Sequence, residues 1–157
     1  MTPAIVAAQK AGIAFTVHDY PHDPQVASYG FEAAEALGVS PQRVFKTLLV
    51  TLNGDAKRLA VGIVPVVHRL DLKGIAAACG AKKAAMAIPA DAERATGYVV
   101  GGISPLGQRK RLPAVIDSSA GQFETVYVSA GRRGLEIELT PQALQQLTGA
   151  DFAAIAR

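Results

Sequence analysis

Apolar residues along the chain fall into short continuous runs that predict buried β-strands. Two of these runs, 44–52 and 58–66, are rich in Val, Leu and Ile, and the segment between them begins with Asn-Gly-Asp. Because Asn-Gly favours the tight turns that join antiparallel strands, the pair predicts a β-hairpin. Further short strands are expected at 15–19, 98–101, 114–117, 125–129 and 135–139.

Helix start and stop signals lie between these runs. Thr2 and Thr140 each precede a proline, which combines an N-cap with a favourable first helical residue. Ser28 and Asp71 are expected to cap two further helices, and glycines follow the expected C-termini. The helices expected from these signals are 4–10, 31–37, 72–79, 91–95 and 142–147.

The order of these elements indicates the fold class. Helices and strands are mixed along the chain, and at least one strand pair is antiparallel. This favours an α+β fold over a doubly wound parallel sheet. We expect a single compact domain over residues 1–157, with a mixed, curled or barrel-like β-sheet flanked by helices.

Composition narrows the class of protein further. Half of the residues are apolar, 18% are charged and the formal net charge is +3, which is unlike a disordered chain and compatible with a polyanionic partner. The lone Cys79 lies in an apolar run, so we expect a core role in a reducing compartment. With no signal peptide and no apolar run of about 20 residues, a cytoplasmic location without a membrane span is expected.

Three apparent motifs fail on chemical grounds. The stretch 102–109 has the glycine spacing of a P-loop but lacks its lysine, and the same stretch lacks the second glycine of a nucleophile elbow around Ser104. His18 and His22 would share a face only on a helix, which Pro21 opposes, and no third ligand follows. No metal and no cofactor are therefore predicted.

Lys46 is the most informative residue. It lies in an otherwise apolar strand, where side-chain alternation places it on one face with Val44 and Leu48. An ammonium there must reach solvent, an anion or a pocket, and an edge lysine extending to water is the simplest interpretation. The glycine-rich segment 97–107 could bring backbone N–H groups to an oxyanion or form a tight bend.

Three stretches taken in order, 45–50, 96–108 and 127–135, resemble the bacterial Cys-tRNA(Pro) deacylases of the YbaK type. These are freestanding relatives of the editing domain in bacterial prolyl-tRNA synthetases, and the resemblance runs over almost the whole chain. It implies that Lys46 holds the aminoacyl end of the tRNA and that Gly101 faces the substrate carbonyl. The residues to which it gives a substrate-binding role are Tyr20, Tyr29, Thr47, Gly102, Ser129 and Glu136. Relatives usually carry phenylalanine at position 29 and aspartate at position 136.

The resemblance also implies a mechanism that needs no protein nucleophile. The cysteinyl thiol of the substrate attacks its own ester carbonyl, releasing a cyclic thiolactone and free tRNA. Prolyl-tRNA synthetase is the implied partner, because its pocket cannot strongly reject cysteine, which is close to proline in size. Two alternatives stay open: a domain of the same fold that clears alanine or another small amino acid by water attack, and a non-catalytic tRNA-binding module.

Overall fold

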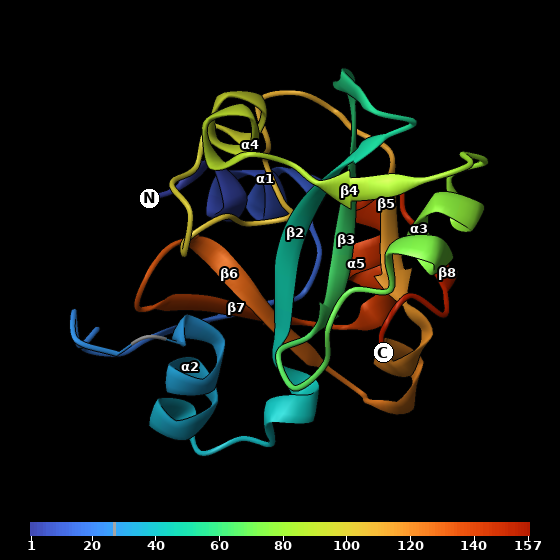
Figure 1. The fold of residues 1–157 in the computed structure, drawn as a ribbon. Helices are drawn as coiled ribbons and strands as arrows, with labels where there is room; N and C mark the ends of the chain where they lie inside the picture. Colours follow the sequence, from blue (N-terminus) through green and yellow to red (C-terminus); the bar gives the residue numbers. More distant parts are fainter. Residues whose placement is uncertain (27) are drawn as a thin grey trace.

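The computed structural model describes residues 1–26 and 28–157, whose strands form two sheets (Figure 1). The larger sheet has the order β4-β2-β3-β5-β8, and the smaller has the order β1-β7-β6. The strands are β1 Thr16–Asp19, β2 Phe45–Leu52, β3 Asp55–Pro65, β4 Ala84–Met86, β5 Ala114–Asp117, β6 Val126–Arg132, β7 Leu135–Leu139 and β8 Asp151–Ala153. The predicted α+β class and mixed strand pairing are confirmed, but within the described residues the strands do not close into a barrel.

Thr2, Asp71 and Thr140 cap three of the described helices with their side chains. Thr140 Oγ1 accepts a hydrogen bond from Ala143 N–H, and Gly149 ends the same helix in the left-handed conformation. Ser28 occupies the predicted N-cap position, but its side chain makes no capping hydrogen bond. The α-helices are α1 Pro3–Ala11, α2 Tyr29–Leu37, α3 Leu72–Ala78, α4 Pro89–Thr96 and α5 Pro141–Thr148, with short 3-10 helices at Pro41–Arg43 and Ser118–Gln122.

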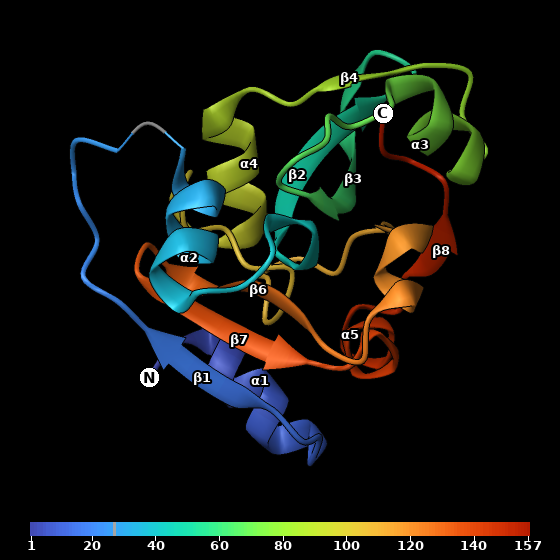
Figure 2. The ribbon, with the colours of Figure 1, turned by 90° about the horizontal axis from the view of Figure 1, so that it is seen from below.

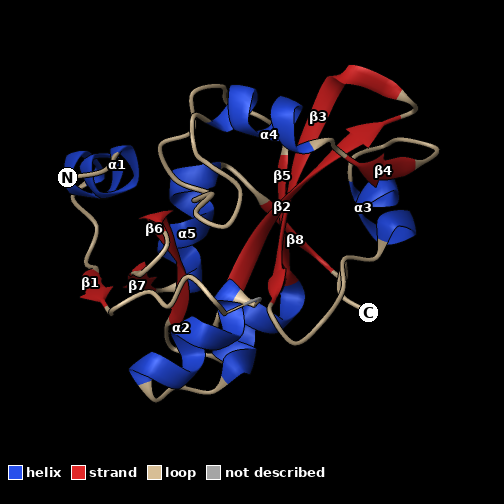
Figure 3. Ribbon diagram, turned by 60° about the vertical axis from the view of Figure 1, so that its left-hand side comes forward, coloured by secondary structure: helices blue, strands red, loops and turns tan. Residues whose placement is uncertain are grey.

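The helices cover both sheets from two sides. Figures 2 and 3 show α1 and α2 on opposite faces of the small sheet, and α3 across the large sheet from α4 and α5. The main core combines both sheets with α1, α4 and α5, and includes Phe45, Ile63, Leu106, Ile137 and Leu144. A second cluster lies between the large sheet and α3, and includes Val50, Val64 and Ile75. None of the helices in the described ranges is long and apolar enough to cross a membrane.

The predicted hairpin is present, and its turn is formed by the Asn-Gly pair on which the prediction rested. Asn53 and Gly54 alone connect β2 to β3, with φ values of 56° and 71°. Two successive positive φ angles are those of a type I′ turn, whose twist matches the strands that it joins. The turn is thus shorter than the five-residue segment expected from the sequence.

The strand expected at 98–101 is wrong. Val100 N–H donates to a Glu93 carboxylate oxygen at 2.8 Å, and Gly102 N–H donates to the Val99 carbonyl at 2.9 Å. These bonds turn the backbone after α4, and the segment does not pair as a strand. It forms a loop beside the site described below. The short strands β4 and β8 were not expected, and each has three residues.

Candidate functional site

The candidate site lies where part of one edge of β2 has no neighbouring strand among the described residues. β4 pairs with β2 only from Val50 to Leu52, while an isolated bridge to β6 is made at Val44. Between these contacts the sheet has a gap, which we call the β2 gap. Backbone groups that point into it are not used by a strand neighbour.

The register of β2 shows that Thr47 faces this gap. On the β3 side, Val66 N–H donates to the Val44 carbonyl at 2.8 Å, and on the other side Ala87 N–H donates to the Leu49 carbonyl at 3.0 Å. Because bonding direction alternates along an antiparallel strand, the Thr47 N–H and carbonyl point toward the gap. A ligand there can therefore bond to the strand edge.

The Thr47 side chain is also unsatisfied. Of the buried side-chain nitrogen and oxygen atoms in residues 1–26 and 28–157, Thr47 Oγ1 alone has no hydrogen-bond partner. A buried polar group left unpaired costs about 1–3 kcal/mol. A ligand hydrogen bond at this hydroxyl would remove that cost.

A pocket of about 450 Å³ opens at the β2 gap, in the size range of small-molecule sites. Its lining includes all of the predicted site residues except Gly102: Tyr20, Tyr29, Lys46, Thr47, Gly101, Ser129 and Glu136. Gly102 lies behind the pocket instead, where a Cβ atom would be only 2.8 Å from Arg132 Cα. A glycine is needed at position 102 because the backbones of Gly102 and Arg132 approach each other closely. The apolar part of the lining includes Leu49, Met86, Ala87, Pro89, Ala92 and Ile103.

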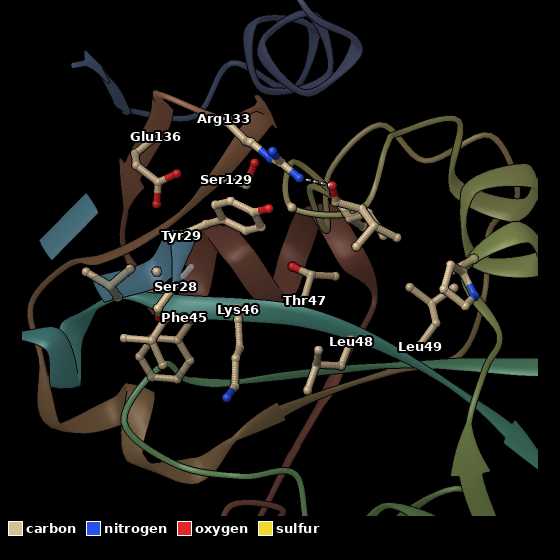
Figure 4. Close-up of a pocket in the computed structure, with 18 of the residues that line it drawn as sticks. Ser28, Tyr29, Phe45, Lys46, Thr47, Leu48, Leu49, Ser129, Arg133 and Glu136 are labelled. Carbon is tan, nitrogen blue, oxygen red and sulfur yellow. Dashed lines mark hydrogen bonds between the residues drawn. The ribbon is translucent and has the colours of Figure 1, made fainter. Parts of the chain in front are cut away.

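Lys46 and Thr47 leave β2 on opposite sides (Figure 4), as strand alternation requires. Burial lowers the pKa of the Lys46 ammonium, and the nearby Arg69 charge lowers it further. Among the described residues no carboxylate forms an ion pair with Lys46. Because Lys46 and Ser129 lie on opposite sides of β2, a ligand that contacts both must extend across the β2 gap.

Ser129 and Glu136 form the polar wall opposite the gap. They are paired residues of β6 and β7, so their side chains lie next to each other on one face. Gly131 N–H donates to Ser129 Oγ at 3.1 Å, which leaves the hydroxyl hydrogen free to donate to a ligand. Glu136 is only 7% exposed, and burial raises its pKa to about 8. The carboxyl is therefore mainly neutral at pH 7 when the pocket is empty.

Tyr20 lies beside this wall at the end of β1. Its backbone N–H donates to the Gly134 carbonyl at 2.9 Å, which fixes the residue at the pocket. Burial, together with the nearby Glu136 and Glu32 carboxyl groups, raises the pKa of Tyr20 to about 12. The phenol consequently stays protonated and can act as a hydrogen-bond donor at neutral pH.

Arg133 is a lining residue that sequence reasoning missed. Its guanidinium carbon lies 3.8 Å from the centre of the Tyr29 ring, and its NH2 group donates a hydrogen bond to the Val100 carbonyl at 3.1 Å. Gly101 has a φ of 93°, and a Cβ there would be 2.5 Å from Arg133 Nε and 2.7 Å from the Tyr29 ring. We call Tyr29, Gly101 and Arg133 the rim cluster. The Arg-Arg-Gly pattern after Ser129 was the signal available in the sequence.

The residues set aside as nucleophiles or metal ligands lie elsewhere. Cys79 is half-buried against the cluster under α3, where burial raises the pKa of its thiol, and it does not line the pocket. His18 contacts Glu138 at 2.9 Å and His22 contacts Glu32 at 2.8 Å. No group of His, Cys, Asp or Glu suited to a metal ion is found in the described part of the chain.

Comparisons with known proteins agree on one family. The family model described as "Aminoacyl-tRNA editing domain" matches residues 23–147. The chain is 43% identical over 122 residues to the "Putative Cys-tRNA(Pro)/Cys-tRNA(Cys) deacylase EbsC" of Enterococcus faecalis, covering 78% of this chain and 73% of that protein. It is also 33% identical over 117 residues to the "Uncharacterized protein YwhH" of Bacillus subtilis, covering 74% and 73%.

Solved structures support the same assignment. A "putative trans-editing enzyme for prolyl tRNA synthetase" superimposes with a TM-score of 0.83 at 25% identity, over 100% of this chain and 99% of that one. The "hypothetical protein APE2540" superimposes with a TM-score of 0.87 at 24% identity, over 99% and 100%, which shows the shared fold. The fold, the matched sequence model and the relatives together show that this chain belongs to the aminoacyl-tRNA editing domain family.

Proposed function

We propose that this protein is a trans-acting aminoacyl-tRNA deacylase that removes cysteine from mischarged Cys-tRNA(Pro), and also from Cys-tRNA(Cys). The family and the name of the Enterococcus relative support the activity and the substrate class. The observation that carries the proposal is the pocket itself. It gathers seven predicted residues at the β2 gap, while the only cysteine of the chain lies outside it.

The pocket lining favours a substrate that brings its own nucleophile. Neither cysteine nor histidine occurs among the described lining residues, so neither a protein thiolate nor an imidazole base is provided. In Cys-tRNA the thiol sulfur attacks the ester carbonyl carbon, the bond from that carbon to the ribose oxygen breaks, and the thiol proton passes to the leaving oxygen. Sulfur, Cβ, Cα and the carbonyl carbon form a four-membered thiolactone. Holding thiol and carbonyl together supplies the proximity that this ring closure needs.

Each wall of the pocket can then take part in holding the substrate. Lys46 holds the aminoacyl end by hydrogen bonding from its ammonium, and Gly101 lies beside the carbonyl that becomes an oxyanion. Tyr20, Thr47 and Ser129 offer hydroxyl groups, while Glu136 offers the only carboxyl group of the described lining for the substrate ammonium. Binding an ammonium would favour ionised Glu136, because an opposite charge lowers a carboxyl pKa.

Recognition of the tRNA identity is assigned to prolyl-tRNA synthetase. With a net charge of only +3, the chain offers few phosphate contacts by itself, and such contacts provide most nonspecific nucleic-acid affinity. We therefore expect similar deacylation of Cys-tRNA(Pro) and Cys-tRNA(Cys) without the synthetase. A preference of hundreds-fold for one of them would contradict this part of the proposal. Because the proposed role is beside the synthetase, we also propose a cytoplasmic location.

The test is a panel of mischarged tRNAs with direct detection of the thiolactone. Purified protein should release cysteine as thiolactone and should clear Ser-tRNA(Pro), which lacks the thiol, poorly. Faster clearance of Ala-tRNA(Pro) than of Cys-tRNA(Pro) would instead support water attack on another small amino acid. Protein that binds tRNA but clears none of the panel would be a non-catalytic tRNA-binding module.

A further inference from the structure

The rim cluster contains a cation without a counter-ion. Arg133 lines the pocket, and none of the ion pairs within residues 1–26 and 28–157 involves it. The one carboxyl group of the described lining, Glu136, is raised in pKa by burial rather than held ionised by a neighbouring cation. The positive charge of Arg133 is therefore available to an anion that enters the pocket.

Contacts from two distant segments hold the Arg133 side chain in place. Its face stacks on Tyr29 of α2, and one of its NH2 hydrogens is used by the Val100 carbonyl of the glycine loop. Tyr29 in turn meets the His22 ring edge-on, with ring centres 5.8 Å apart. A guanidinium has five N–H donors in one plane, so stacking and a single bond leave donors on its edge for a ligand.

The chemistry of an aminoacylated 3′ end identifies the matching group. The ester, ribose and base are uncharged and the amino group is a cation, which leaves phosphate as the anion. Guanidinium groups bind phosphate oxygens in pairs with charge-assisted hydrogen bonds. The terminal phosphate is separated from the ester by one ribose, which suits a residue at the rim of a pocket that holds the ester.

We propose that Arg133 binds the 5′-phosphate of the terminal nucleotide. The Tyr29 ring and the Val100 carbonyl hold the Arg133 side chain in position, and Gly101 leaves room for it. This inference rests on the proposed deacylase function and adds a binding residue that the family resemblance did not indicate. Figure 4 shows Arg133 and Ser129 on the same side of β2, opposite to the side on which Lys46 leaves the strand. The acceptor end would then be held from both sides of the β2 gap.

Two small substrates isolate this contact. The cysteinyl ester of adenosine has no phosphate, whereas the cysteinyl ester of adenosine 5′-monophosphate has only the phosphate in question. For wild type we expect a higher kcat/KM on the monophosphate ester. For Arg133→Gln we expect a fall of about 10- to 100-fold on the monophosphate ester and on Cys-tRNA(Pro), but less than about twofold on the adenosine ester. Arg133→Lys should lie between, because it keeps the charge and loses the paired geometry.

The neighbouring arginine provides a matched control. Arg132 is the preceding residue at the end of β6 and carries the same charge, but it is exposed and does not line the pocket. Arg132→Gln should change kcat/KM on all three substrates by less than about threefold, and alike. An equal loss on both small esters in Arg133→Gln would show a structural role and overturn the inference, as would a wild type indifferent to the phosphate. If wild type cleaved none of the cysteinyl substrates, the proposed function itself would fail.

Discussion

Lys46 and Arg133 are the two cationic side chains among the described lining residues, and the chain holds them in different ways. Lys46 projects from a regular strand, so its position follows from the alternation of β2 alone. Arg133 follows a bulge between Ser129 and Arg132, and its position depends on contacts with α2 and the glycine loop. The position of a charge on one regular strand is predictable from a local pattern, whereas the position of a charge held by contacts with two distant segments is not.

The largest effect should come from Lys46, because we propose that it holds the aminoacyl end of the substrate. Lys46→Ala is expected to lower kcat/KM by about 10³-fold or more on Cys-tRNA(Pro), as losses of several kcal/mol in transition-state binding do. The loss should be equal on the adenosine and monophosphate esters. Lys57→Ala, an exposed lysine on β3, is the control and should leave deacylation unchanged.

Two outcomes would break the assignment of different roles to the two cations. Near-parent turnover in Lys46→Ala would remove Lys46 from the site. A loss confined to the monophosphate ester would move the phosphate contact from Arg133 to Lys46, where Arg69 is a nearby second cation. Running both variants on both small esters decides between these assignments.

Gly101 should have the next largest effect, because it leaves room for the Arg133 side chain. A methyl group there would lie 2.5 Å from Arg133 Nε, on a backbone whose φ of 93° already disfavours a side chain. Gly101→Ala should displace Arg133 and lower kcat/KM on Cys-tRNA(Pro) by about 10²-fold. In an Arg133→Gln background the same substitution should cost less, because the Arg133 contact is already lost, and the loss that remains measures the effect of Gly101 at the substrate carbonyl.

The matched control for Gly101→Ala is Gly38→Ala. Gly38 ends α2 with a φ of 68°, and a Cβ atom there would meet nothing within 4 Å. It should lose about 1 kcal/mol of stability from backbone strain, measured by chemical denaturation, and keep its deacylase activity. Equal losses of activity in the two variants would mean that strain, and not the displacement of Arg133, explains Gly101→Ala.

The same contrast explains which features the sequence could reveal. The helices that begin after Thr2 and Thr140 and the hairpin at Asn53 were predicted because caps and turns act within a few residues. The strand at 98–101 was wrong because the Glu93 carboxylate and a glycine turn occupy its backbone. β4 and β8 were missed because three-residue strands carry little pattern and depend on partners far along the chain.

The site likewise has features that the sequence could indicate and features that depend on long-range pairing. The resemblance named the residues at the pocket, but the β2 gap arises from the pairing of β2 with β4 and β6, which no local pattern encodes. The unpaired Thr47 hydroxyl and the stacking of Arg133 on Tyr29 follow from that arrangement. Lys46 could be identified as unusual, although its direction relative to Ser129 could not.

Glu136 is the carboxyl group of the described lining that could neutralise Lys46 or Arg133, and the pH dependence of stability tests whether it does so. Its pKa of about 8 in the folded protein lies above the ordinary carboxyl value of 4.5, so wild type should lose stability as pH rises from about 4.5 through 8. Glu136→Gln should lack this loss. At about 1.4 kcal/mol per pKa unit, its stability relative to wild type should rise by a few kcal/mol between pH 5 and pH 9.

Chemical denaturation across this range measures the difference, with Glu35→Gln, an exposed glutamate of α2, as the control. A relative stability that stays constant between pH 5 and pH 9 would indicate that Glu136 is already ionised and paired in the free protein, because the pKa of a paired carboxyl lies below its ordinary value of 4.5. Arg133 would then have a counter-ion in the empty pocket, and the phosphate proposal would lose one of its supports.

The smallest effect is expected at Tyr29, where the family resemblance implies phenylalanine. Tyr29→Phe keeps the aromatic face on which Arg133 stacks, and the described residues make no hydrogen bond to the hydroxyl that it removes. Deacylation of Cys-tRNA(Pro) should change by less than about threefold, because stacking on a phenyl ring is nearly as favourable as on a phenol. Tyr29→Leu removes the face and should approach the loss seen in Arg133→Gln, again only on substrates with a phosphate. A large loss in Tyr29→Phe would instead mean that the hydroxyl contacts the substrate, which would make Tyr29 a residue of the reacting end, like Lys46.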